Sequence, residues 1–261
     1  MISRRWVLTT AHCLFDPSLS DPLEPRQIKV LVGTNNLLSG EDQVIDVARV
    51  VPHPDFSSDL NTVEADPGLI ELATPASADP IPLNRFASNP LASEGTLAWI
   101  TGWSSRAFDD GTPTDFPAEL HEAQVPLLSV SSRQERYTSS GLSILDSHLC
   151  TGFPDGEVGT CVADSGGLAF LSDKEGKFLQ LSITSADEGY AGVFPGVYAR
   201  ISSYFQWIEE NTASSLYFSQ FGDGREFSSE VVLFNPSSEV PSSSETDPGT
   251  PSTLTTNLDL L

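Results

Sequence analysis

Residues 162–167 read VADSGG, and this short stretch decides how the whole chain is interpreted. A serine that follows an aspartate and precedes two glycines is a nucleophile signature. A serine hydroxyl alone is a poor nucleophile at neutral pH, so it requires a base and a group that orients that base. If Ser165 is a nucleophile, both partners must lie elsewhere in the chain.

Two distant segments supply these partners. Residues 6–13 read WVLTTAHC, an apolar and β-branched run that predicts a strand leading into a short turn that presents His12. Residues 66–72 read DPGLIEL, which places Asp66 directly before a second strand, with Glu64 as another carboxylate nearby. In chain order the candidate catalytic residues are therefore His12, Asp66 and Ser165.

With these residues in hand, the chain resembles the chymotrypsin/trypsin family of serine endopeptidases from Met1 to about Asn211. Further matching blocks follow the family's order: VPHPDF at 51–56, ITGW at 100–103, EAQVPL at 122–127, PGVYAR at 195–200 and YFQWI at 204–208. The resemblance implies two antiparallel six-stranded β-barrels, the first of them incomplete in this chain, with a C-terminal helix. It also implies that the catalytic residues lie at the junction of the barrels.

Composition agrees with such an all-β fold. The chain has 261 residues, of which 39% are hydrophobic, so it is long enough for one large all-β domain. Short β-branched runs such as 28–32 and 44–51 are bounded by turn residues, as in antiparallel barrels or sandwiches. Helical periodicity is confined mainly to 202–211. We therefore expect one protease-like domain over 1–211.

The resemblance implies a role for each candidate residue. Ser165 attacks the scissile carbonyl, His12 accepts its proton and later donates it to the leaving amine, and Asp66 holds the imidazole in the useful tautomer. Ser185 matches the serine that helps to fix the aspartate, and no cofactor or metal is implied. The other histidines have no nucleophile motif around them and are interpreted as surface or packing residues; they are His53, His121 and His148.

Ala163 is the main departure from the family's motif, which has glycine at this position. The N–H groups of Ala163 and Ser165 are expected to bind the developing oxyanion. If φ is positive at Ala163, alanine costs about 1 to 2 kcal/mol to hold the same conformation. If the peptide is rotated instead, one oxyanion donor is lost, at a cost of about 100 to 1000 fold in rate. Two functions stay open: a serine endopeptidase of reduced activity that acts through an acyl-enzyme, and a catalytically impaired homologue that binds peptides or proteins in the same cleft.

The resemblance also implies a substrate pocket. Its base is Gly159, where trypsin-like enzymes carry an aspartate, and Gly196 leaves one wall open, with Ser185 close by. Ala186 and Asp187 replace the usual Trp-Gly pair that lines the entrance. Simple tryptic specificity is therefore not expected, and an apolar or mixed preference is predicted. Asp187 could attract a basic side chain from the rim, although a solvated loop carboxylate is the simpler interpretation.

The chain has three cysteines, which cannot all pair with one another. In the family, the partner of Cys13 lies on a strand that would precede Met1, and the partner of Cys161 falls at Tyr190. Cys150 lacks its usual upstream partner, and a bridge from Cys150 to Cys161 would have no family precedent. We expect a substrate pocket with fewer disulfides than in relatives.

The first residues match the middle of the family's first barrel. The family's active form inserts a freed N-terminal amine beside the aspartate that precedes the nucleophile, which in this chain is Asp164. We interpret the sequence as clipped at its N-terminus, with a short variant that has a repacked barrel as the alternative.

Net charge is −23, from 36 acidic and 13 basic residues. Nucleic acids and anionic membranes would be repelled, which disfavours both as partners. A solvated acidic surface is the simplest interpretation, and a saline habitat is a hypothesis that it suggests. No stretch is long and apolar enough to span a bilayer. The expected partner is a protein or peptide substrate, the default state is a monomer, and the resemblance implies secretion.

The composition changes after Asn211. Residues 212–236 predict a linker and a candidate β-hairpin around a Gly-rich turn, which resembles the opening of modules appended to bacterial extracellular proteins. Residues 237–261 are rich in Ser, Thr and Pro and predict a flexible acidic tail.

Overall fold

The computed structural model describes residues 1–16, 18, 21–40, 43–57, 64–109, 112–137, 143–153, 158–173, 175–186 and 195–213. Residues 1–212 form one compact unit. The candidate hairpin and the tail predicted after Asn211 lie outside the described residues, apart from their first two positions.

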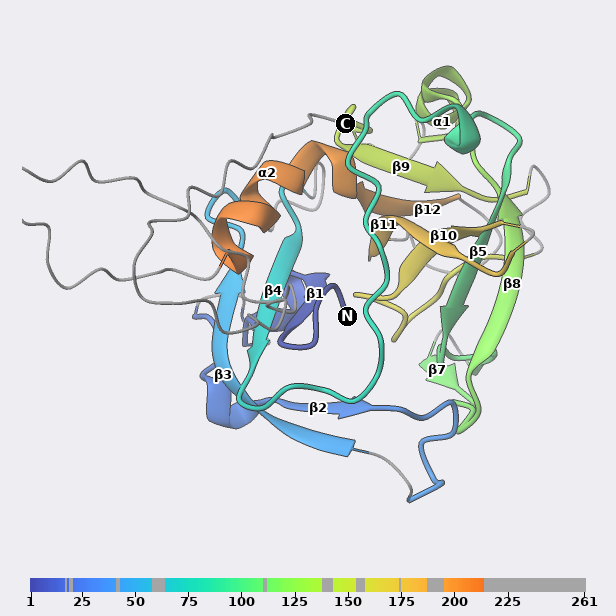
Figure 1. Cartoon of the computed structure of the whole chain (residues 1–261). Helices are drawn as coiled ribbons and strands as arrows, with labels where there is room; N and C mark the ends of the chain where they lie inside the picture. The colour runs from blue at the N-terminus through green and yellow to red at the C-terminus, as the bar shows by residue number, and fades with distance from the viewer. Residues whose placement is uncertain are drawn as a thin grey trace, which may run out of the picture. The chain divides into compact units, whose positions relative to one another are not determined.

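The first sheet has four antiparallel strands in the order β1–β4–β3–β2 (Figure 1). These strands are β1 (Trp6–Thr10), β2 (Lys29–Val32), β3 (Gln43–Pro52) and β4 (Pro67–Leu72). Every second residue of β1 is buried, which is the burial that a period-2 strand with one core face requires. The strands predicted from the β-branched runs are therefore confirmed.

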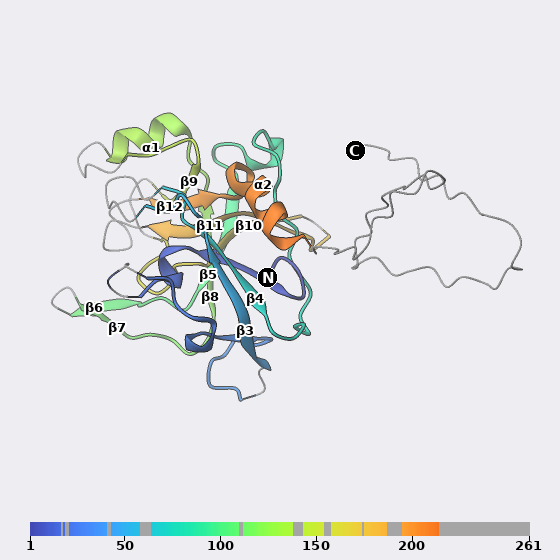
Figure 2. The same cartoon turned by 90° about the vertical axis from the view of Figure 1, so that its left-hand side faces the viewer.

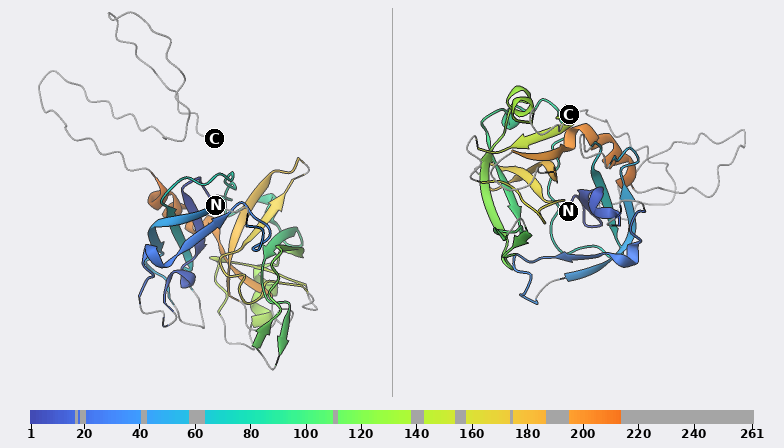
Figure 3. Two further views of the ribbon diagram at one scale, coloured as in Figure 1. Left: turned by 90° about the horizontal axis from the view of Figure 1, so that it is seen from below. Right: turned by 180° about the vertical axis from the view of Figure 1, so that it is seen from behind.

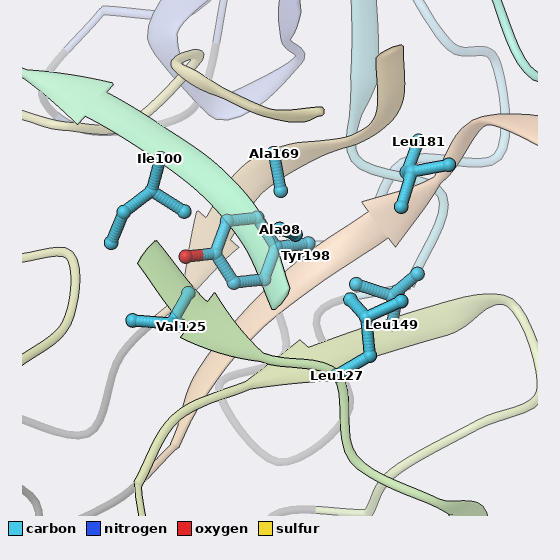
Figure 4. Close-up of a cluster of buried hydrophobic side chains, with 8 residues drawn as sticks. All are labelled: Ala98, Ile100, Val125, Leu127, Leu149, Ala169, Leu181 and Tyr198. Atoms are coloured by element: carbon cyan, nitrogen blue, oxygen red, sulfur yellow. The ribbon is translucent and has the colours of Figure 1, made fainter. Parts of the chain in front are cut away.

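The second sheet has six antiparallel strands in the order β8–β5–β10–β11–β12–β9. They are β5 (Leu97–Gly102), β8 (His121–Pro126), β9 (His148–Thr151), β10 (Leu168–Ser172), β11 (Phe178–Ala186) and β12 (Gly196–Arg200). The sheet closes on itself, because Leu127, next to the end of β8, bridges Thr151 of β9. Figure 4 shows the side chains that fill its interior: Ala98, Ile100, Val125, Leu127, Leu149, Ala169, Leu181 and Tyr198.

The two sheets differ in closure. In the described residues no ladder joins β1 to β2, so the first sheet is a curled half-barrel, as the incomplete barrel implied by the resemblance predicts. The all-β fold class is confirmed. Figure 3 (left) shows the strands of the first sheet, in blue to cyan, on one side and those of the second, in green to orange, on the other.

An apolar cluster joins the two sheets to the C-terminal helix α2 (Ile201–Thr212). Its buried members are Trp6, Leu8, Leu69, Ile183, Ile201 and Ile208, from β1, β4, β11 and α2. In α2 the buried residues are spaced by three and four positions, as one face of a helix requires. The helix predicted over 202–211 is confirmed, and this cluster fixes the ends of β1, β4 and β11, where the candidate residues lie.

The remaining elements are small. They are α1 (Val130–Tyr137), the hairpin of β6 (Ala107–Asp109) and β7 (Thr112–Thr114), and three 3-10 turns over His12–Leu14, Pro25–Gln27 and Pro90–Ala92. Helix α1 lies beside β9 (Figure 2), where Tyr137 packs against Cys150. The sequence did not predict α1, because its segment, VSSRQERY, has no apolar stripe of helical period.

Candidate active site

The pairing of β1 with β4 brings His12 and Asp66 together. In this antiparallel ladder Thr10 lies opposite Pro67, so the residues just beyond these two positions are neighbours. The N–H of Ala11 donates to the backbone carbonyl of Asp66, and the chain then turns into the short 3-10 helix that begins at His12. Sequence alone suggested each residue, whereas the strand register explains their contact.

The Asp66 carboxylate is the centre of a buried hydrogen-bond network. It is 1% exposed, and its Oδ1 accepts the backbone N–H of His12 at 2.9 Å. Its Oδ2 lies 2.9 Å from Nδ1 of His12 and also accepts the hydroxyl of Ser185. Since an ionised carboxylate only accepts hydrogen bonds, Nδ1 must carry the proton, and Nε2 is then the free basic nitrogen of the neutral ring.

The electrostatics of His12 follow from this contact. Burial by itself lowers the pKa of His12, but the hydrogen bond and charge of Asp66, helped by Cys13, outweigh burial and raise the pKa above its usual value. The carboxylate therefore stabilises the imidazolium form. This is the property that a general base needs once it has taken up a proton.

Asp164 anchors the loop that carries Ser165. Its carboxylate accepts the backbone N–H of Ser104 at 3.0 Å and that of Cys161 at 3.1 Å. It occupies the space of a side chain at Gly102, where an added Cβ would lie 1.8 Å from Oδ1. Burial raises the pKa of Asp164, and the hydrogen bonds from Ser104 and Cys161 oppose that rise. Two backbone N–H groups thus hold this carboxylate, and the lack of a side chain at Gly102 leaves the space that it occupies.

The N–H groups of the loop divide into two sets. Three of them donate to backbone carbonyls: Asp164 to Cys161 (3.0 Å), Gly166 to Thr184 (2.9 Å) and Gly167 to Asp164 (2.8 Å). Those of Ala163 and Ser165 donate to no acceptor within the described part of the chain, and both residues are exposed. Ala163 has a φ of 80°, the first of the two conformations considered from sequence. Both N–H groups are therefore available to an external acceptor.

Contact between the two sheets places the loop that carries Ser165 beside the end of β1 and the turn that follows it. Gly166, with a φ of 84°, packs so closely on β1 that an added Cβ would lie 2.4 Å from Oγ1 of Thr9. The thiol of Cys13 lies 4.0 Å from the carbonyl oxygen of Ser165. Over the described residues, no hydrogen bond joins the Ser165 hydroxyl to His12. In the absence of substrate such catalytic bonds are often long or poorly aligned.

The residues expected in the substrate pocket lie in different surroundings. Among the residues that the structure describes, no atom lies within 4 Å of a Cβ added at Gly159. A Cβ added at Gly196 would lie 2.9 Å from the hydroxyl oxygen of Thr160 and 3.0 Å from the ring of Tyr198, so packing requires glycine there. Ser185 bonds Asp66, Ala186 pairs with Val197 of β12, and Asp187 lies outside the described residues.

The cysteines form no disulfide among the described residues. Cys13 is exposed, whereas Cys150 and Cys161 are buried. In the same residues no group of three His, Cys, Asp or Glu side chains could bind a metal ion. The helices that the structure describes are too short or too polar to cross a membrane.

Several residues that shape the site carry no signal in the sequence. Gly102 lies within a matching block, yet nothing in the sequence indicated that it makes room for Asp164. Ala65 precedes Asp66 with a φ of 53° and is 3% exposed, an unusual conformation for alanine that no sequence signal announces. Strained backbone of this kind tends to cluster at functional sites.

Comparisons with known proteins show the family to which the chain is similar. The family model for trypsin matches residues 1–208. The chain is 27% identical to pig (Sus scrofa) trypsin over 82% of its own length and 84% of that protein, and 33% identical to mouse (Mus musculus) tryptase over 80% and 75%. It is 33% identical to the transmembrane protease serine 9 of the rat (Rattus norvegicus) over 81% of its length, but it spans only 19% of that relative.

Proposed function

The chain belongs to the trypsin family, and on that premise we propose that it is a serine-type endopeptidase that cleaves peptide bonds through an acyl-enzyme. Membership of this family supports a serine peptidase function. The residue roles, the mechanism and the substrate preference are our proposal, as is the domain assignment over 1–211. The same holds for an extracellular location.

In the first half of the reaction, Ser165 Oγ attacks the scissile carbonyl while Nε2 of His12 takes its proton. The resulting imidazolium is stabilised by Asp66, which does not itself become protonated. His12 then donates that proton to the amine as the C–N bond breaks, which leaves an ester between Ser165 and the acyl group. Water attacks this ester in the second half, with His12 again as base and then as acid.

The N–H groups of Ala163 and Ser165 are the proposed oxyanion donors. Their exposure and their lack of acceptors among the described residues support this role, as does the φ of Ala163. Donors that have no backbone acceptor need not give up a hydrogen bond as charge develops on the carbonyl oxygen. Alanine at this position is therefore compatible with catalysis at the cost of backbone strain.

The proposed pocket base is neutral. Thr151 donates a hydrogen bond to the hydroxyl of Tyr198 at 3.2 Å, and the hydroxyl of Thr160 lies 3.3 Å from the same atom. Burial raises the pKa of Tyr198 to about 12, so its hydroxyl stays uncharged at neutral pH. A cationic substrate side chain would lose its hydration in this pocket without gaining a counter-charge from Gly159. We propose a preference for apolar or mixed side chains, testable with matched peptides that carry Phe, Leu or Arg before the scissile bond.

The observation that carries the proposal is the buried carboxylate of Asp66 on Nδ1 of His12. We propose to test it with a fluorophosphonate probe, which reacts with an activated serine hydroxyl, on the parent protein and on Ser165→Ala. Labelling of the parent alone is the expected result. Absence of labelling from a folded parent would favour the alternative, a catalytically impaired homologue that binds peptides, and equal labelling of both proteins would refute Ser165 as nucleophile.

A further inference from the structure

The segment that carries Asp66 is held in an unfavourable backbone shape. Ala65 has a φ of 53°, a region that residues other than glycine and asparagine rarely enter. It is buried in a small cluster with Ala199 and with Tyr204 of α2. Burial raises the pKa of Tyr204, and the neighbouring side chain of Ser147 and backbone of Ala65 oppose that rise. Helix α2 therefore helps to fix the residue that precedes the proposed catalytic aspartate.

His53 contacts this segment from two sides. Its ring centroid lies 4.7 Å from that of Trp207 and 5.4 Å from that of Tyr204, both on α2. Its backbone N–H donates to the carbonyl of Pro67, the residue after Asp66, at 3.0 Å. His53 thus links two elements that flank Asp66. One is helix α2, which packs on Ala65, and the other is β4, which begins at Pro67.

The side chain of His53 can hold this place in one protonation state only. Its Nδ1 accepts the backbone N–H of Asp55 at 3.2 Å, so Nδ1 must carry no proton. Protonation of the ring would turn this acceptor into a donor that faces another donor. Either the His53 ring would then rotate away from Trp207 and Tyr204, or the hydrogen bond from the N–H of Asp55 to Nδ1 of His53 would be lost.

We propose that His53 is a positioning residue for Asp66, and that protonation of its ring releases the turn at 53–55 from α2 and loosens the Ala65–Asp66 segment. The link to catalysis rests on the proposed function, whereas the link to the fold does not. Acid would therefore act on the contact between the turn at 53–55 and helix α2. This contact takes no part in the proposed chemistry of His12.

The charges around His53 favour a response below neutral pH. Burial lowers the pKa of His53, and Asp55 on its own turn opposes that shift. On α2 the facing group is Tyr204, whose pKa is raised by burial, and Glu64 and Asp66 before β4 act on that tyrosine. The folded state therefore takes up this proton at a lower pH than the unfolded chain. Stability is retained above the ordinary histidine pKa of about 6.5 and declines as the pH falls through the lowered pKa.

The contribution of His12 to stability changes with pH in the opposite direction, so the effects of the two histidines can be told apart. Because Asp66 raises the pKa of His12, that residue contributes stability below the ordinary histidine pKa and loses it as the pH rises through the raised value. A loss of stability on the acid side that involves His53 cannot come from His12.

The test compares the parent with His53→Asn, whose side-chain oxygen can accept the N–H of Asp55 but cannot titrate, and with His121→Asn, a control on an exposed histidine of β8. Tryptophan fluorescence and the unfolding temperature are measured from about pH 7 to about pH 5, the range in which histidines titrate. We expect the fluorescence and the unfolding temperature of the parent and of the control to fall with the pH, because an imidazolium beside Trp207 quenches the fluorescence of that residue. In His53→Asn both should fall markedly less. The acid limb of kcat should also move to lower pH in His53→Asn, with KM unchanged.

Trp207→Phe provides a second measurement that does not depend on the folding of His53→Asn. It should abolish the fluorescence change while keeping the fall in unfolding temperature. Identical pH dependence in the parent and a folded His53→Asn would overturn the proposal, as would a fluorescence change that survives Trp207→Phe. Both readouts remain valid if the protein fails to label with fluorophosphonate, so failure of this proposal is distinguishable from failure of the proposed protease function.

Discussion

The two halves of the candidate site are organised in different ways. On the His12 side, a buried carboxylate receives three hydrogen bonds, two of them from side chains, and it fixes both the place and the tautomer of the imidazole. On the Ser165 side, backbone N–H groups, glycines and a positive φ at Ala163 set the shape, and Ser165, the proposed nucleophile, is exposed. Side-chain hydrogen bonds orient the proposed base, His12, whereas backbone conformation shapes the proposed oxyanion site.

The largest effect should come from removing the charge on the His12 side. Asp66→Asn keeps the size of the side chain but presents an amide in place of a carboxylate, so the imidazole is expected to take the wrong tautomer. In enzymes with this triad the corresponding change lowers kcat by about ten-thousand-fold. Measured kcat/KM and fluorophosphonate labelling should both fall while the fold is retained. Loss of less than about tenfold would mean that Asp66 does not orient His12.

A smaller but still large effect should follow from blocking the backbone on the Ser165 side. Gly102→Ala would place a methyl group on the carboxylate of Asp164, which must then move and take the loop with it. Loss of one oxyanion donor costs about 100 to 1000 fold in kcat. Gly159→Ala is the matched control for the unfolding temperature alone, because its methyl group would meet no described atom within 4 Å. An unfolding temperature and kcat unchanged in Gly102→Ala would show that Asp164 does not anchor the loop.

Ala163→Gly should sharpen the comparison by relieving strain without altering chemistry. Holding alanine at positive φ costs about 1 to 2 kcal/mol, and the added freedom of glycine in the unfolded chain offsets about 0.4 to 1 kcal/mol of that. We expect the free energy of unfolding to rise by up to about 1.6 kcal/mol, measured by urea titration, with kcat/KM at least equal to that of the parent. A variant with lower kcat/KM would indicate that the methyl group itself contributes to the site.

Ala65→Gly should give the smallest change, although φ is also positive there. Relief of strain is offset by the loss of a buried methyl group between Ala199 and Tyr204, which contributes about 0.8 kcal/mol, and by the freedom of glycine in the unfolded chain. The free energy of unfolding should therefore stay within about 0.8 kcal/mol of the parent. A gain equal to that of Ala163→Gly would mean that packing does not hold Ala65.

Much of the fold was accessible from sequence because its strands carry a period-2 pattern and its helix α2 an apolar face. His12 and Ser165 were accessible because each lies in a short motif of its own. The contact between Asp164 and Gly102 was not, since it depends on how β5 and the nucleophile loop meet in space. The conformation of Ala163 could only be given as two alternatives, because tertiary packing decides whether alanine is held at positive φ. Helix α1 was missed because it lacks an apolar stripe.

The contact of Gly166 with Thr9 has a consequence for the order of folding events. Neither sheet contains the whole site, and Cys13 and Ser165, which touch across the junction, are 152 residues apart in the chain. Contacts between residues so far apart in the chain form late, since closing the long loop between them costs conformational entropy. During refolding, recovery of Ser165 reactivity should lag behind recovery of β-structure. Reactivity of this serine would then report the arrival of the complete native state rather than of either half.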